Sequence, residues 1–236
     1  MGFRQQIFSP TAIVEPDRLE KDQPYSAYLL ATNYSVIIYS ERKIKLSNEI
    51  GLGVMGPIAL GEEVQSFVHQ IVNSPRPLGW DNQLKNTFLI DYQFRIEKGF
   101  GKDWLANHFV PFVGVRIGTL TDRIQIGAML KVGNKVKYLK IGNNLGEMNK
   151  KFIWEWVFGA NLQGVFYDAP LEGGLFSNDV NALDKSEIMS RQYQFRTGVN
   201  LYYRNLTIRY MLNFNSSHFD TAEYHRFGGV NIGYSF

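Results

Sequence analysis

The stretch RQYQFRTGVNLYYRNLTIRYMLNF, residues 191–214, decides the fold of this chain. From Tyr193 to Tyr203 every second side chain is aromatic, aliphatic or threonine, and those between them, up to Asn200, are Gln, Arg, Gly and Asn. After a turn at Arg204-Asn205 the alternation resumes from Leu206 to Phe214. A period of two residues is typical of β-strands whose two faces meet different surroundings. This stretch therefore predicts two long strands joined by a tight turn.

The same alternation returns along most of the chain and predicts ten strands. The expected strands cover about residues 2–8, 25–41, 42–55, 86–97, 107–118, 122–132, 152–167, 189–204, 205–215 and 225–236. The intervening segments 9–24, 133–151 and 168–188 are polar or contain Pro and Gly, which predicts loops.

One stretch breaks the strand pattern. From Gly61 to Asn73 the apolar residues fall at helical spacing, which predicts a short helix between two strands. One face of this helix carries Val64, Phe67, Val68 and Ile71, and the other carries Glu62, Gln65 and His69.

A soluble β-sandwich also alternates, but its strands usually have about 5–6 residues. Most strands here have ten or more, and aromatic residues lie at the ends of the apolar stripes, as at the two interfaces of a membrane barrel. The final strand ends at Phe236, with Tyr234, Ile232 and Val230 on the same face, and resembles the terminal strand of bacterial outer-membrane barrels. We expect an all-β fold, an antiparallel transmembrane β-barrel, as a single domain over residues 1–236.

The composition limits the function classes. The 236 residues include no cysteine, which excludes disulfides and a thiolate nucleophile, and the net charge of +3 gives no argument for nucleic acid. No apolar run approaches the ~18 residues of a spanning helix. The start, Met1 to Gln5, has no basic segment followed by an apolar core, so it does not predict a signal peptide.

The candidate catalytic residue is His69, because a histidine on a polar helix face can act as a general base near neutral pH. From its position alone, an exposed or packing role is the commoner one. We expect His108, His218 and His225 to be interfacial or surface residues. No two histidines have the spacing of zinc ligands on one element, and there is no Gly-x-Ser-x-Gly motif. The sequence identifies neither a metal ligand nor a substrate-binding residue.

Several spaced motifs resemble the lipid A 3′-O-deacylase family. Gln5-Gln6-Ile7-Phe8-Ser9-Pro10 is similar to the family's Gln-x-(Tyr/Phe)-(Thr/Ser)-Pro strand end, and Asp22-Gln23-Pro24-Tyr25-Ser26-Ala27-Tyr28 is similar to its Asp-Arg-Pro-Tyr-Ala-Gly-Trp segment. The other matching stretches are residues 52–57, 59–65, His69, 79–86 and 111–118. The likeness is close over about residues 2–132 and architectural beyond them.

The resemblance implies an outer-membrane enzyme that hydrolyses the 3′-linked acyl esters of lipid A. It implies that His69 activates a water and that calcium assists the oxyanion. Gln65, one turn earlier, either orients the imidazole or packs the helix against the barrel. We expect the loop at Pro77-Leu78-Gly79-Trp80-Asp81 to anchor at the interface, and we expect a monomer, because a closed barrel needs no partner.

The chain departs from the family at its start. The family begins with an Asn-Asp … Tyr-Thr-Asn-Gly hairpin that this sequence lacks, so ten strands are expected here against twelve in the complete family, and truncation at the N-terminus is expected. The alternative function is therefore a catalytically inactive relative or fragment that acts as a structural barrel or a narrow pore. A soluble ligand-carrying barrel is disfavoured by the strand lengths and by Phe236.

Overall fold

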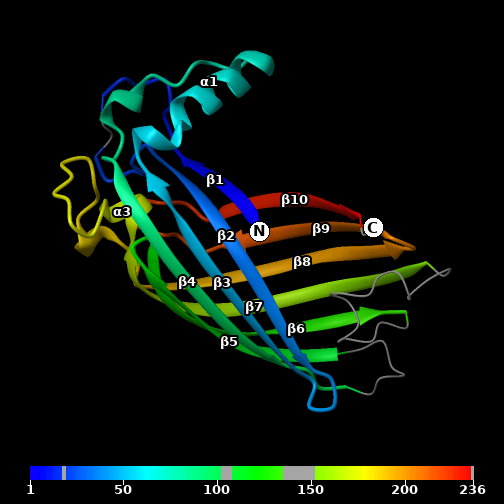
Figure 1. Cartoon of the computed structure of the whole chain (residues 1–236). Helices are drawn as coiled ribbons and strands as arrows, with labels where there is room; N and C mark the ends of the chain where they lie inside the picture. Colours follow the sequence, from blue (N-terminus) through cyan, green and yellow to red (C-terminus); the bar gives the residue numbers. More distant parts are fainter. Residues whose placement is uncertain (18–19, 102–107, 135–151, 235–236) are drawn as a thin grey trace.

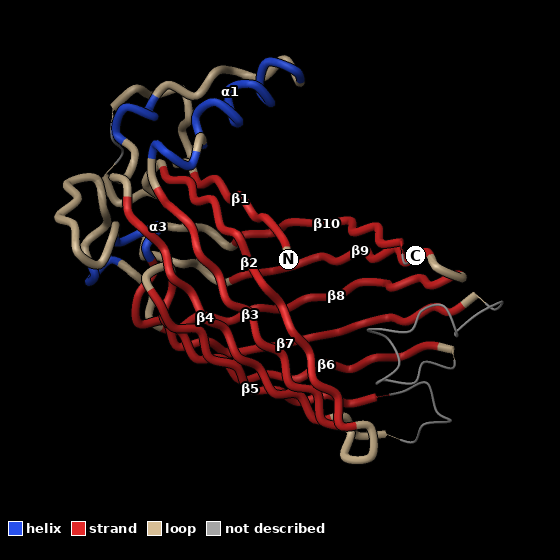
Figure 2. Tube along the Cα trace, in the orientation of Figure 1, coloured by secondary structure: helices blue, strands red, loops and turns tan. Residues whose placement is uncertain are grey.

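The fold is a single curled sheet of ten antiparallel strands in sequence order, seen in a computed structural model that describes residues 1–17, 20–101, 108–134 and 152–234 (Figures 1 and 2). The strands are β1 (Gly2–Phe8), β2 (Ser26–Tyr39), β3 (Ile44–Met55), β4 (Thr87–Lys98), β5 (His108–Gly118), β6 (Thr121–Gly133), β7 (Ile153–Asp168), β8 (Arg191–Tyr203), β9 (Leu206–Asn215) and β10 (His225–Tyr234).

The expected strands are confirmed, with each described boundary within two residues of its expected place. The helix is confirmed as α1 (Gly61–Ile71). The expected loop at 168–188 also contains α3 (Ala169–Glu172) and a short 3-10 helix, Lys185–Glu187. Elements of three or four residues are too short to leave a periodic pattern in the sequence. Phe236 and most of the expected loop 133–151 lie outside the described residues.

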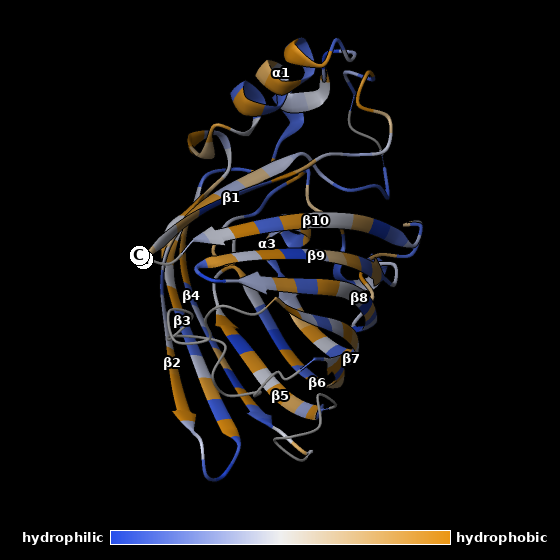
Figure 3. Cartoon of the chain, turned by 90° about the vertical axis from the view of Figure 1, so that its right-hand side faces the viewer, coloured by the Kyte–Doolittle hydropathy of each residue, from blue (hydrophilic) through white to orange (hydrophobic). Residues whose placement is uncertain are grey.

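The sheet curls until its two edge strands, β1 and β10, lie near each other (Figures 1 and 3). Each of them pairs on one side only, β1 with β2 and β10 with β9. Within the described part of the chain, no ladder of hydrogen bonds joins β1 to β10. The barrel wall therefore has one open seam, with unpaired backbone groups on both of its sides.

The outer face of the sheet is apolar, as the alternation predicts. Bands of hydrophobic and hydrophilic residues alternate along the strands in Figure 3. On β2, β3 and β4 the exposed residues Leu29, Leu52 and Ile90 lie on the outer face, and their register partners across the sheet share that face. We call the exposed apolar residues of this outer face the lipid-facing belt.

The inner face carries buried charges that pair with one another. Nε of Arg116 donates to both carboxylate oxygens of Asp91, at 2.8 and 2.9 Å. Nζ of Lys131 lies 3.3 Å from Oε1 of Glu155, which also accepts a hydrogen bond from Asn200. Because buried charges are tolerated only when paired, these contacts make the polar inner face compatible with folding.

The expectation that His108 is a surface or interfacial residue is wrong. Its side chain is only 2% exposed, because His108 shares the inward face of β5 with Val110 and Phe112. Its partner in the register of β6 is Lys131, whose side chain also points inward. His225 is exposed and His218 is half-buried.

An apolar cluster packs together at the end of the barrel where α1 lies. Its buried members come from strands, turns and α3: Tyr28, Leu30, Met55, Leu84, Leu89, Leu120, Tyr167 and Ala169. Leu84 precedes β4 and Leu120 lies in the turn between β5 and β6, so loops as well as strands contribute to this cluster. None of the helices in the described ranges is long and apolar enough to cross a membrane.

Candidate active site

The helix that carries His69 belongs to the segment that connects β3 to β4 along the chain, and it stands at one rim of the sheet (Figure 1). Leu60 precedes it in the left-handed conformation, with φ 56°, and no side chain caps its first turn. Glu62 and Glu63 lie in the first turn, where negative charge complements the helix dipole. The charges favour helix formation where an N-cap side chain is missing.

The helix begins on the outer wall of the barrel. A Cβ on Gly61 would lie 2.4 Å from Cβ of Ala27 and 2.6 Å from Cη2 of Trp80, so only glycine fits between them. Ala27 shares one face of β2 with Leu29, which belongs to the lipid-facing belt. The start of α1 is therefore packed on the membrane side of the wall and not in the lumen.

Trp80 fixes the loop that follows α1. It is 2% exposed, its ring lies 4.9 Å from that of Tyr25, and it belongs to a small buried cluster with Tyr25, Ala27 and Ala59. The loop is thus anchored by packing on the barrel wall, and its expected place at the membrane interface stays a prediction. A Cβ on Gly79 would lie 2.5 Å from the Tyr25 ring, so glycine is also required next to Trp80.

Gln65 connects the middle of α1 to two loops, the one that follows β1 and the one that follows α1. Its Oε1 accepts a hydrogen bond from Nε1 of Trp80 at 2.9 Å, and its Nε2 donates to Oγ of Ser9 at 3.4 Å. Of the two roles open to Gln65, these contacts favour packing of the helix. They also bring together Ser9, Gln65 and Trp80 from three of the motif stretches.

His69 has a defined tautomer. Its Nδ1 lies 2.6 Å from the backbone oxygen of Pro75. A carbonyl oxygen only accepts hydrogen bonds, so Nδ1 carries the proton and donates it. When the imidazole is neutral, Nε2 therefore has a free lone pair, which is the state that a general base requires.

His69 lines an open hollow of about 550 Å³ along α1 and the loop after it. The lining residues are Glu63, Ser66, Phe67, His69, Gln70, Ser74 and Arg76. Arg76 is largely exposed and approaches Oε1 of Glu62 at 3.7 Å. The sequence did not single out Arg76 or Ser74, because nothing in their spacing tells which residues of an irregular loop turn back toward a helix.

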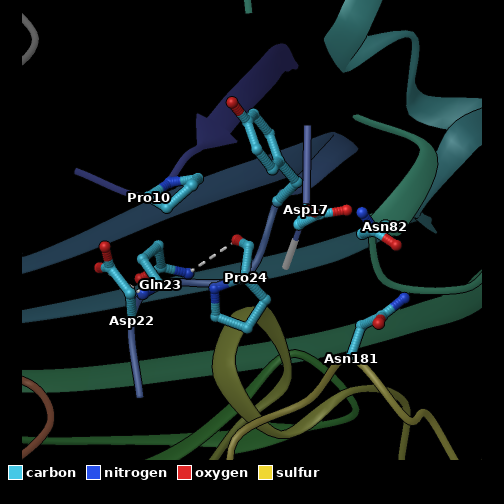
Figure 4. A pocket seen from close by; sticks show the side chains of 8 residues that line it. Pro10, Asp17, Asp22, Gln23, Pro24, Asn82 and Asn181 are labelled. Carbon is cyan, nitrogen blue, oxygen red and sulfur yellow. Dashed lines mark hydrogen bonds between the residues drawn. The ribbon is translucent and has the colours of Figure 1, made fainter. Parts of the chain in front are cut away.

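A second, smaller hollow lies between the loops at the same end of the barrel (Figure 4). Asp22 in this hollow already accepts hydrogen bonds from the backbone N–H groups of Thr11 and Gln23, at 2.9 and 2.7 Å. Asn82 donates to the carbonyl of Pro16. This hollow shares no lining residue with that of His69, so it is not part of the candidate site.

The resemblance implies a calcium site, whose ligands would be side chains or backbone oxygens of this protein. Among the residues that the structure describes, no group of three or more His, Cys, Asp or Glu side chains could hold a metal ion. Calcium also binds backbone and amide oxygens, so it stays a prediction of the resemblance.

Comparison with known proteins agrees with the fold. No curated protein matches the chain. Among solved structures, the chain is similar to one described as LpxR from Salmonella typhimurium, with a TM-score of 0.85 and 23% sequence identity over 98% of this chain and 81% of that one. At this identity the likeness supports the outer-membrane β-barrel fold. The family model described as "Outer membrane protein LpxR" matches residues 1–236, so the chain belongs to this outer-membrane family, to which its sequence motifs pointed.

Proposed function

We propose that this protein is an outer-membrane hydrolase that removes the ester-linked acyl chain from the 3′ position of lipid A, with His69 as general base. The proposal is supported chiefly by the position of His69 relative to the membrane. The helix with His69 starts on the outer wall of the barrel, on the face of the lipid-facing belt. A lipid of the outer leaflet reaches such a site directly, whereas a soluble substrate in the lumen does not.

The chemistry follows from the tautomer of His69. Nε2 takes a proton from a water molecule, and the resulting hydroxide attacks the acyl carbonyl carbon. The tetrahedral intermediate then collapses, the bond between that carbon and the sugar oxygen breaks, and His69 returns the proton to the leaving hydroxyl. The products are a free fatty acid and a sugar with one more hydroxyl group. The carbonyl of Pro75 holds Nδ1–H throughout and stabilises the imidazolium as it forms.

The lining of the hollow suits a phosphorylated glycolipid. Arg76 offers an exposed guanidinium, which pairs well with phosphate oxygens. Phe67 offers an apolar surface in the same hollow, next to where an acyl chain would enter. Calcium stays a prediction of the family resemblance, and no step above uses it.

Mass spectrometry of lipid A tests the proposal, in cells that express this chain or its His69→Ala variant. Loss of acyl chains with the first and not the second is expected. Equal loss with both would rule out His69 as the base. A third arm fuses the family's N-terminal hairpin ahead of Gly2, because β2 is the one strand that pairs with β1 among the described residues. No loss in any arm would leave the alternative, an inactive barrel. Activity in purified form with EDTA or with added calcium tests the metal.

A further inference from the structure

One face of α1 has no partner among the residues that the structure describes. Its apolar residues recur at the positions i, i+3, i+4, i+7 and i+8, which puts them on a single stripe of the helix. They are Val64, Phe67, Val68, Ile71 and Val72, and each is between 37% and 66% exposed. The opposite face carries Gln65, Ser66 and His69, all partly buried. The helix thus turns its polar side toward the protein and its apolar side outward.

This arrangement is the reverse of that in a helix of a soluble protein, where the apolar stripe faces the core. Large apolar patches on a surface mark a site of contact with another apolar phase or molecule. The hydropathy colouring of Figure 3 shows hydrophobic residues along α1 at the rim of the barrel.

The apolar stripe is continuous with the lipid-facing belt. Ile58 and Leu60, both more than half exposed, lie between the end of β3 and the start of α1. They connect the helix to Leu52 and Phe88 on the outer face of β3 and β4. Because the helix also begins on the outer wall, at Gly61, the membrane that covers the belt reaches the helix.

We propose that α1 is an interfacial helix, which lies in the outer leaflet with its apolar stripe among the acyl chains. The polar face, which is turned toward the protein, then holds the His69 hollow at the level of the outer-leaflet headgroups. An amphipathic helix of this kind is held in a membrane interface by its buried apolar area. The inference rests on the outer-membrane location and not on the proposed hydrolase activity, so each can fail without the other.

The lack of cysteine in the chain makes a direct test available. Single cysteines carrying an environment-sensitive fluorophore are introduced by Ile71→Cys on the apolar stripe and Gln70→Cys beside it. Both side chains are exposed in the protein alone, so they differ chiefly in the face they occupy. Ile90→Cys on the belt serves as the membrane reference, and Lys185→Cys, exposed in the short 3-10 helix Lys185–Glu187, serves as the water reference.

The labelled proteins are folded into phosphatidylcholine vesicles, with a nitroxide on a lipid acyl chain as one quencher and aqueous iodide as the other. We expect the label at 71 to emit at shorter wavelength and to be quenched by the nitroxide, as at 90. The label at 70 should be quenched by iodide several-fold more than that at 71. Equal iodide quenching at 70 and 71 would overturn the proposal. So would shielding of 71 from both quenchers, which would indicate a protein partner such as a second copy.

Discussion

Nε1 of Trp80 donates a hydrogen bond to Oε1 of Gln65 at 2.9 Å, and this bond joins the helix that carries His69 to the loop that follows it. Trp80 is buried against Tyr25 on the outer wall of the barrel, whereas the later turns of α1 project from its rim (Figure 1). The position of His69 therefore depends on a small number of contacts near the start of its helix.

Removal of this hydrogen bond should loosen α1 without unfolding the barrel. Trp80→Phe and Gln65→Leu should each speed hydrogen exchange of the α1 amides by about fivefold, because one such bond contributes about 1 kcal/mol. The double variant should fall short of the sum of the two effects, since both changes remove the same bond. Trp156→Phe is the matched control. It removes the hydrogen bond from the indole N–H of Trp156 to Thr197 on the barrel, and the hydrogen exchange rate of the α1 amides should not change. Full additivity in the double variant would show that the bond does not couple the two residues.

Glycine at position 61 should be required for the helix to start on the wall. In Gly61→Ala the new Cβ would overlap Ala27 and Trp80, both packed against neighbours, so the helix start must shift. Overpacking of this kind costs about 1–3 kcal/mol. We expect intact barrel folding, measured by heat-modifiable migration on gels, together with loss of most lipid A deacylation. Gly229→Ala on β10, where a Cβ meets nothing within 4 Å, should leave both unchanged. Wild-type activity in Gly61→Ala would contradict this role.

The strands were predictable because each has two faces in different surroundings, and the resulting alternation survives in stretches such as Tyr193–Tyr203. The helix was predictable for the same reason, but not its orientation. Helical spacing places Val64 opposite Ser66 without saying which side faces the protein, and only the packing of Gly61 and Trp80 decides that.

The candidate site was predictable only in part. His69 stood out as a lone histidine on a polar face. Its tautomer, however, depends on the backbone carbonyl of Pro75, a group that every residue type carries. Backbone groups leave no signature in a sequence. His108 was mistaken for a surface residue because a histidine at a strand end can face either way, and a shift of one residue decides between them.

The loop between β9 and β10 should open as the pH falls. Burial, and then the positive charges of His225 and Arg123, lower the pKa of His218 below its ordinary value of 6.5. The unfolded loop thus binds the proton more readily than the folded one, so stability falls as the pH drops below about 6.5 and levels off below the folded pKa. The loop packs through Phe219 against Leu171 and Leu183, which this opening should disturb.

Urea unfolding in micelles at pH about 8 and about 5 measures this effect. The wild type should lose more stability toward the acid side than His218→Asn, which has no proton to gain there. Carboxyl groups titrate in both proteins, so their contribution cancels in the difference. His225→Asn should show an intermediate loss, because it removes one of the charges that lower the pKa of His218. Equal losses in wild type and His218→Asn would assign the acid sensitivity to other groups.

Arg76 should contribute to substrate binding and not to the chemical step. It lines the hollow of His69 with an exposed guanidinium, while Nε2 of His69 performs the proton transfer in the proposed mechanism. Arg76→Gln should therefore raise KM for phosphorylated lipid A severalfold and leave kcat nearly unchanged, as expected when a uniform binding contact is lost. Arg76→Lys should recover only part of the affinity, because an ammonium lacks the two-pronged donor geometry of the guanidinium. The control is Glu62→Gln: its ion pair with Arg76, at 3.7 Å and exposed, contributes little, so the variant should keep its KM or lower it by freeing the guanidinium. A fall in kcat with Arg76→Gln at constant KM would place Arg76 in the transition state instead.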